Sequence, residues 1–185
     1  RSITYSELLQ RIDRVAEAFY QFGVHKGNIV SVLMPTTPES ICILYALNKI
    51  GATPNFIDPR MDPERILSAV AGVRSELFVT IDLAYHKVQA IRDRLNVKRI
   101  VVSSASYSLP IPLKLIWKIK NRQKIAYSDV VLSWERFLAE AKGDPVPVAP
   151  FVEDSVAAIV YTGGTTGTPK GVMLRQFGII NSGLS

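Results

Sequence analysis

The residues best suited to chemistry in this chain form one short run, "TGGTTGTPK", at residues 162–170. Three of them, Gly163, Gly164 and Gly167, have no side chain, so the backbone can take positive φ angles and approach a ligand closely. Five more supply hydroxyl donors and a positive charge: Thr162, Thr165, Thr166, Thr168 and Lys170. Successive N–H groups of this kind form a nest for an anion, and each hydrogen bond to a charged oxygen contributes about 1.5–3 kcal/mol. The run therefore predicts a loop that binds a polyphosphate, and a nucleoside triphosphate suits it best.

The spacing of this loop excludes two better-known phosphate motifs. A Walker A loop needs Gly-x-x-x-x-Gly-Lys-Ser/Thr, whereas Lys170 follows Pro169 and precedes Gly171. In the dinucleotide fingerprint the third glycine lies where a helix begins, whereas the extended segment "GVML" follows the loop here. A flexible linker is the alternative interpretation, but a linker between two strands has little need for four threonines and a lysine.

The elements around the loop alternate between short apolar strands and amphipathic helices. Strands are predicted over 28–34, 53–58, 76–80, 98–104 and 155–162, with a short extended segment over 171–174. Helices are predicted over 5–22, between Thr37 and Gly51, and over 62–72, 83–95 and 133–143, from apolar residues at helical spacing and from capping residues. This alternation predicts an α/β fold: a doubly wound, mostly parallel sheet with helices on both faces. Ligands bind at the carboxyl ends of the strands of such sheets, and the loop leaves the end of one.

The chain is predicted to be divided into three segments. Residues 1–104 form a sheet-and-helix subdomain. Residues 105–154 form a basic, proline-rich insertion followed by a helix and a linker, and residues 155–185 hold a strand, the loop and the start of a next subdomain.

The net charge of +6 is mostly local. Residues 110–126 contain five basic side chains and no acid: Lys114, Lys118, Lys120, Arg122 and Lys124. A nucleic-acid-binding domain spreads its basic residues over a whole face, so this cluster argues against nucleic acid as a partner. Its apolar neighbours leave peripheral membrane contact as one interpretation. Packing on the protein's own surface is favoured, because most amphipathic stretches bury their apolar face that way.

Other reactive side chains are few. One cysteine, Cys42, lies in an apolar run, which excludes an internal disulfide and predicts a reducing, cytoplasmic location. His25 and His86 stand alone without metal-ligand spacing and are expected to lie on the surface. Asp58 and Asp62 flank prolines and are expected to act as turn and cap residues.

The run "YTGGTTGTPKGVML" over 161–174 resembles the phosphate-loop signature of the adenylate-forming superfamily, which includes acyl-CoA synthetases, aryl-CoA ligases, luciferases and peptide-synthetase adenylation domains. Upstream, "ITYSEL" (3–8) is similar to the opening helix of that family, and "NKIGATPNFIDP" (48–59) to its Gly-Ala…Pro segment. "TGGTTG" and the stretch "SLPIPLKLIWKIKNRQK" look most like the long-chain fatty acyl-CoA synthetases. The resemblance runs nearly from end to end, in the order and spacing of the family.

The resemblance implies an activity, its cofactors and its partners. Such enzymes join a carboxylic acid, here a fatty acid, to the α-phosphate of ATP and then pass the acyl group to coenzyme A. Thr162 to Lys170 would close over the β- and γ-phosphates, with Lys170 neutralising their charge and Thr165 or Thr166 near Mg²⁺. Relatives often carry histidine, near the acyl site, where this chain has Gln176.

The family's later catalytic segments are not among these residues, so we expect the chain to be the amino-terminal part of a ligase and to be inactive without the rest of the same chain. Two alternatives stay open. One is a non-catalytic nucleotide-binding or scaffold module with the same fold. The other is an adenylation domain for an amino or aryl acid.

Overall fold

The computed structural model describes residues 3–107, 125–162 and 170–184. Within these ranges the chain forms a seven-stranded sheet in the order β5-β4-β3-β1-β2-β6-β7. The strands are β1 (Ile29–Leu33), β2 (Thr53–Ile57), β3 (Leu77–Ile81), β4 (Arg99–Ser103), β5 (Val131–Ser133), β6 (Val156–Tyr161) and β7 (Gly171–Arg175). All neighbouring pairs are parallel except β6 and β7, which are antiparallel. The predicted α/β class and mostly parallel sheet are confirmed.

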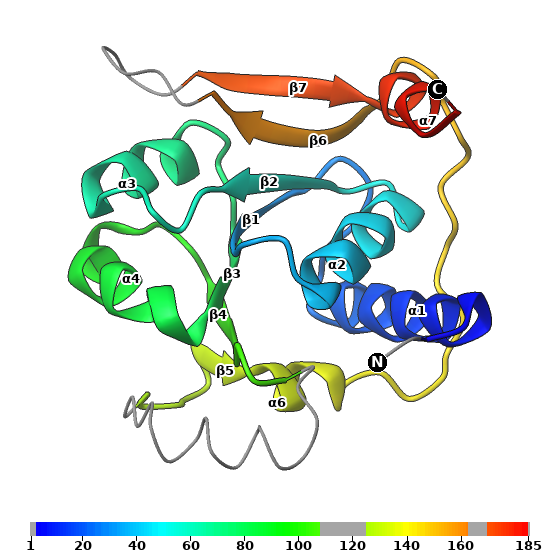
Figure 1. The fold of residues 1–185 in the computed structure, drawn as a ribbon. Coiled ribbons are helices and arrows are strands. Elements are labelled where there is room, and N and C mark those ends of the chain that lie inside the picture. The colour runs from blue at the N-terminus through cyan, green and yellow to red at the C-terminus, as the bar shows by residue number, and fades with distance from the viewer. Residues whose placement is uncertain (1–2, 108–124, 163–169, 185) are drawn as a thin grey trace.

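Helices cover both faces of the sheet (Figure 1). The helices α1 (Tyr5–Gln21), α2 (Pro38–Lys49) and α6 (Trp134–Leu138) form one group, in which α1 packs against both others. The helices α3 (Pro63–Ala71) and α4 (Tyr85–Ile91) pack against each other. The chain moves from β1 to β2 in one direction and from β2 to β3 in the other. Right-handed crossovers therefore place α2 on the opposite face from α3 and α4.

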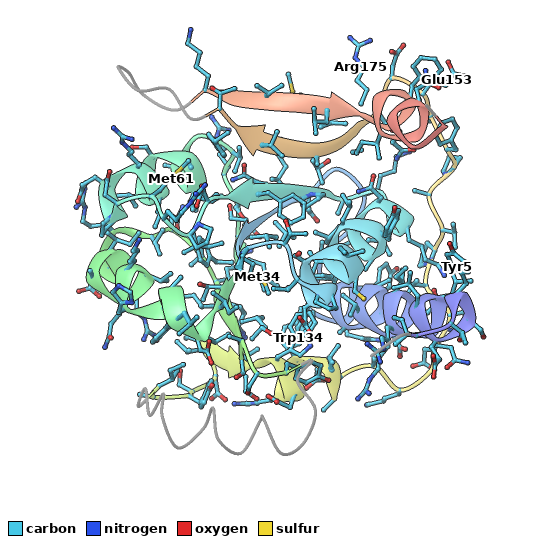
Figure 2. The ribbon with its side chains drawn as sticks, in the orientation of Figure 1. Tyr5, Met34, Met61, Trp134, Glu153 and Arg175 are labelled. Carbon is cyan, nitrogen blue, oxygen red and sulfur yellow. The ribbon has the colours of Figure 1, made fainter. Side chains whose placement is uncertain are left out.

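The core is apolar and continuous through the sheet and both helix layers. Trp134 points from α6 into the interior (Figure 2) and is almost fully buried. Phe137 stands between two aromatic neighbours on α6 and α1, with its ring 5.2 Å from Trp134 and 4.9 Å from Phe19 between centroids. Burial of a side chain of this size stabilises the fold by about 1.5–3 kcal/mol. Cys42 is buried in the same core, as its apolar surroundings predict.

The helix starts follow the predicted caps. Thr4 and Glu7 form a reciprocal capping box at α1, where the Glu7 N–H donates to the Thr4 hydroxyl at 3.2 Å and the Thr4 N–H donates to the Glu7 carboxylate at 2.8 Å. Thr37 caps α2, and the Asp62 carboxylate caps α3 by accepting the N–H of Arg65 at 3.0 Å. The first residues of α1, α2 and α3 are therefore set by local side-chain chemistry.

The helix predicted over 133–143 is wrong in length, because α6 ends at Leu138. The N–H groups of Lys142, Gly143 and Asp144 donate instead to the buried carboxylate of Glu17 on α1, at 2.6, 3.0 and 3.0 Å. Gly143 takes a φ of 96°, which is left-handed. The chain then reaches β6 without further helix or strand, in line with the linker predicted over 144–150.

Three other elements differ from the predictions. The helix predicted over 83–95 is divided into a 3-10 turn at Asp82–Ala84, α4, and a second 3-10 turn at Arg92–Arg94. The short strand β5 and the helix α7 (Gln176–Leu184) were not predicted. The sheet takes strands from all three segments proposed for the chain, and the division into those segments stays a prediction.

Candidate functional site

The phosphate-loop run lies between β6 and β7, at the carboxyl end of β6. The two strands pair with Tyr161 opposite Gly171. The Thr162 N–H donates to the Lys170 carbonyl at 3.2 Å, which closes the base of the loop. A Cβ on Gly171 would meet Ile159 Cγ2 at 3.3 Å and the Tyr161 ring at 3.4 Å, so glycine here permits a close approach of the two strands.

The predicted site residues divide into two groups. Thr162 and Lys170 are described and both are exposed at the base of the loop. The other six lie outside the described residues: Gly163, Gly164, Thr165, Thr166, Gly167 and Thr168. Their roles, and the anion nest itself, stay predictions.

A pocket of about 720 Å³ opens at the carboxyl edge of the sheet, beside Val160 and Tyr161, the last two residues of β6. The pocket lies at the ends of three neighbouring strands. Phe56 of β2 pairs with Val160 of β6 on one side and with Val32 of β1 on the other. Its walls are lined by Met34, Pro35, Thr36, Ser40, Ile41, Leu44, Phe56, Ile57, Asp58, Pro59, Arg60, Val160 and Tyr161. A mostly apolar wall with a few polar groups at one end is typical of a small-molecule site, and this edge is where open α/β sheets bind ligands.

Charged side chains shape the rim of this pocket. Arg60 binds the Asp58 carboxylate through Nε and Nη2, at 3.0 and 2.6 Å to Oδ2. These hydrogen bonds hold the pKa of Asp58 below its usual value, although partial burial acts in the other direction. Lys87 on α4 donates to the carbonyls of Pro59 and Met61 at 2.8 and 2.9 Å. The turn at 58–61 is thereby held in place, with the Arg60 side chain almost wholly exposed.

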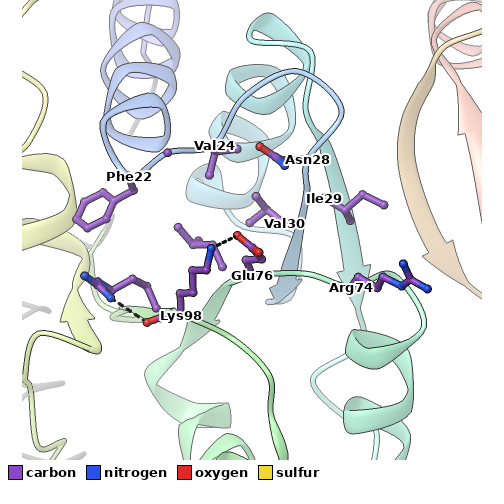
Figure 3. Close-up of a pocket in the computed structure, with 11 residues that line it drawn as sticks. Phe22, Val24, Asn28, Ile29, Val30, Arg74, Glu76 and Lys98 are labelled. Carbon is purple, nitrogen blue, oxygen red and sulfur yellow. Dashed lines mark hydrogen bonds and ion pairs between the residues drawn. The ribbon is translucent and has the colours of Figure 1, made fainter.

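A second, much smaller pocket lies at the opposite edge of the sheet (Figure 3). Its volume is about 60 Å³, and it is lined from the amino-terminal ends of β1, β3 and β4. Lys98 and Glu76 form an ion pair of 2.7 Å across it, and the Arg99 guanidinium donates to the Lys98 carbonyl at 3.1 Å. The space is too small for a nucleotide and is on the wrong side of the sheet for the loop.

The described residues contain no group of three or more His, Cys, Asp or Glu side chains that could hold a metal ion. Asp58 and Asp62 act as turn and cap residues, and His25 and His86 are exposed, as predicted.

The segment for which membrane contact was considered, 110–126, lies outside the described residues except for its last two positions. In the described part of the chain, no helix has both the length and the apolar character needed to cross a membrane.

Several residues around the loop base could not be assigned from the sequence. Arg60 lies in a turn, and its position on the pocket rim depends on the pairing of β2 with β6. The Tyr161 hydroxyl donates to the Ala69 carbonyl on α3 at 3.1 Å, across 92 positions of the sequence. A polar residue in an apolar strand indicates a buried polar contact, and Asn55 in β2 is such a residue near Ala69.

Comparison with known proteins gives matches along the whole chain. The family model for the AMP-binding enzyme matches residues 1–185. The acetyl-coenzyme A synthetase of Emericella nidulans is 30% identical over 97% of this chain and 26% of its own length. The long-chain-fatty-acid–CoA ligase of Bacillus subtilis is 24% identical over 97% of this chain and 33% of its own length. The chain therefore spans about a quarter to a third of the length of these relatives.

Solved structures share the fold. An anthranilate CoA ligase in complex with anthranoyl-AMP matches 95% of this chain and 30% of its own, with a TM-score of 0.76 and 19% identity. A long-chain-fatty-acid-CoA ligase from Archaeoglobus fulgidus matches 99% of this chain and 32% of its own, with a TM-score of 0.75 and 24% identity. With the family model matching from the first residue to the last, the chain belongs to the AMP-binding enzyme family and corresponds to the amino-terminal portion of the adenylate-forming large domain.

Proposed function

We propose that the full-length protein containing this chain is an ATP-dependent acyl-CoA ligase. A carboxylate oxygen of the acid attacks the α-phosphorus of ATP, and pyrophosphate leaves. The thiol of coenzyme A then attacks the acyl carbonyl, and AMP leaves. The observation that carries the proposal is that the phosphate-loop run follows β6, whose last residues Val160 and Tyr161 line the 720 Å³ pocket, in a chain that matches the AMP-binding family throughout.

The loop would act on the first step by holding the leaving group. Backbone N–H groups and hydroxyls between Thr162 and Lys170 would bind the β- and γ-phosphate oxygens, and the Lys170 ammonium would neutralise the charge that develops as pyrophosphate departs. Mg²⁺ bound to the phosphates, with Thr165 or Thr166 nearby, would share that charge. Positioning and electrostatic stabilisation suffice for a phosphorus centre with a good leaving group.

The acid we propose is a fatty acid, because "TGGTTG" and the basic segment after Ser108 resemble the long-chain enzymes. Acetate is a second candidate, supported by similarity to several acetyl-coenzyme A synthetases. Exchange of ATP with labelled pyrophosphate, measured with acetate, octanoate and palmitate in turn, separates the two. We further propose that residues 1–185 alone do not catalyse the reaction, since they cover only part of the large domain.

Replacement of Lys170 by alanine in the full-length protein tests the role of the loop. Loss of one charge-assisted contact to phosphate should slow ATP–pyrophosphate exchange roughly ten- to a hundred-fold. The matched control is Lys26→Ala, which removes an exposed lysine near the amino-terminal edge of the sheet and should leave the rate unchanged. An unaltered rate in Lys170→Ala would contradict the role given to this lysine. Absence of exchange with every acid in the unmodified protein would favour a non-catalytic module.

A further inference from the structure

A chain of buried polar groups runs beneath α3, from the start of β3 to the exit of β6. The Ser31 N–H donates to the Ser75 hydroxyl at 2.8 Å, and the Asn55 amide donates to the Ser31 hydroxyl at 3.1 Å. Asn55 and Ser31 are fully buried, and Ser75 nearly so. Buried polar groups cost free energy unless they are hydrogen-bonded, so a connected row of this kind fixes the relative positions of the strands that carry it.

The row ends on one carbonyl of α3. The last turn of a helix leaves carbonyls without intrahelical partners, and in α3 the carbonyls of Ser68, Val70 and Ala71 accept backbone N–H groups from residues 72–74. The Ala69 carbonyl accepts side chains instead: the Asn55 amide at 3.3 Å and the Tyr161 hydroxyl at 3.1 Å. Tyr161 is thus hydrogen-bonded to a carbonyl in the last turn of α3.

Tyr161 also contacts the far side of the loop base. Its ring lies within 3.6 Å of the position that a Cβ of Gly171 would occupy, and Gly171 is its partner across the strand pair. Its neighbour Thr162 donates to the Lys170 carbonyl. One side chain therefore touches both strands at the place where the phosphate-loop run begins and ends.

We propose that Tyr161 is a positioning residue for the phosphate-binding loop. Its hydroxyl fixes the exit of β6 on α3, and its ring fixes Gly171, so that Thr162 and Lys170 are held at the spacing from which the loop meets the ATP phosphates. The proposal rests on the function proposed above. It assigns to Tyr161 no contact with ATP; the residue acts through the backbone of its neighbours.

The protonation of the phenol supports this assignment. Burial raises the pKa of Tyr161 more strongly than the neighbouring Asn55 amide lowers it. The hydroxyl is therefore protonated at neutral pH and available as a donor. Tyr161→Phe removes this donor and keeps the ring against Gly171.

The test is steady-state kinetics of the full-length Tyr161→Phe protein. Loss of one hydrogen bond that holds the loop should raise the KM for ATP about five-fold and leave the KM for the acid unchanged. Tyr5→Phe is the control, because Tyr5 is 88% exposed on α1, and it should change neither constant. A second readout is amide hydrogen exchange in the peptide that contains Thr162, which should become faster in Tyr161→Phe and not in Tyr5→Phe.

A role in folding alone gives a different result. If Tyr161→Phe lowers the urea midpoint while the KM for ATP and the Thr162 exchange rate stay at their original values, the positioning role is overturned. The two proposals also fail separately. A slow Lys170→Ala protein with an unaffected Tyr161→Phe protein removes this inference and keeps the proposed function, whereas an unaffected Lys170→Ala protein removes the function given to the loop.

Discussion

The two edges of the sheet differ in how they use their polar groups. At the amino-terminal edge the pocket beside Glu76 and Lys98 measures about 60 Å³, and a pocket beside Lys49 and Ala149 measures about 270 Å³. Backbone groups at this edge are hydrogen-bonded to one another: the Gly27 N–H donates to the Gly51 carbonyl at 2.9 Å, and the Ala149 N–H donates to the Lys49 carbonyl at 2.7 Å. At the carboxyl-terminal edge the pocket measures about 720 Å³, and Lys170 and Arg60 are exposed. The larger pocket therefore lies at the carboxyl-terminal edge, and we expect substitutions there to change kinetic constants and substitutions at the other edge to change stability.

The largest expected effect, on stability, comes from Glu17, whose carboxylate accepts the N–H groups of residues 142–144. Glu17→Ala leaves the N–H groups of Lys142, Gly143 and Asp144 without their charged acceptor. Loss of three hydrogen bonds to a buried carboxylate should lower the free energy of unfolding by about 3 kcal/mol, as measured by urea denaturation. Kinetic constants of the folded protein should change little. A large rise in KM with unchanged stability would contradict the division between the two edges.

The same carboxylate predicts a pH dependence. Burial raises the pKa of Glu17, but the three backbone N–H groups and Arg14 outweigh it, so the net pKa is below the usual value for glutamate. A lowered pKa in the folded state contributes stability above the unfolded pKa, and that contribution is lost as the pH falls through the folded pKa. Glu17→Gln should therefore show a shallower loss of stability in acid than the unmodified protein.

A smaller effect, on catalysis, is expected at the carboxyl-terminal edge from Arg60→Ala. Removal of this cation leaves the Asp58 carboxylate unpaired at the pocket rim, which should repel an anionic substrate and raise the KM for ATP or coenzyme A about three-fold, less so at high salt. Arg94→Ala is the matched control, because Arg94 forms a similar two-point pair with Glu64 away from the pocket. If Arg60→Ala and Arg94→Ala change these KM values equally, the position of Arg60 on the pocket rim does not matter for substrate binding.

The smallest effect is expected from Lys98→Met at the amino-terminal edge. The Lys98–Glu76 pair is more than half exposed, and such pairs contribute less than about 1 kcal/mol. The urea midpoint should shift slightly and all kinetic constants should stay unchanged. A clear loss of activity would place part of the catalytic function at this edge and reverse the comparison.

The sequence predicted elements whose boundaries depend on neighbouring residues. The caps at Thr4, Thr37 and Asp62 lie within three residues of the groups that they bind, so local chemistry was sufficient. The length of α6 was wrong because Glu17, more than 120 positions away, binds the amides that would continue the helix. Helix α7 was missed because Gly178 and Gly183 are poor helix formers, whereas its first N–H groups bind Ser155 and Glu153.

The candidate site divides in the same way. The glycines, threonines and lysine follow one another in the sequence, so the position of this run between a strand and an extended segment could be predicted. Its phosphate-binding role stays a prediction. The pocket beside it could not, because it depends on the pairing of β2 with β6 over about a hundred positions. The contact between Tyr161 and Ala69 depends on the same pairing.

The pairing of β2 with β6 also has a consequence for assembly of the protein during synthesis. Amino-terminal parts of a chain emerge from the ribosome first, so β1 to β4 can associate before β6 exists. Until residue 161 has emerged, β2 is an exposed edge strand, and its unpaired backbone N–H and C=O groups could pair with a strand of another polypeptide. Insertion of β6 thus covers this edge of β2 and brings the start of the phosphate-loop run, Thr162, to the carboxyl end of the sheet.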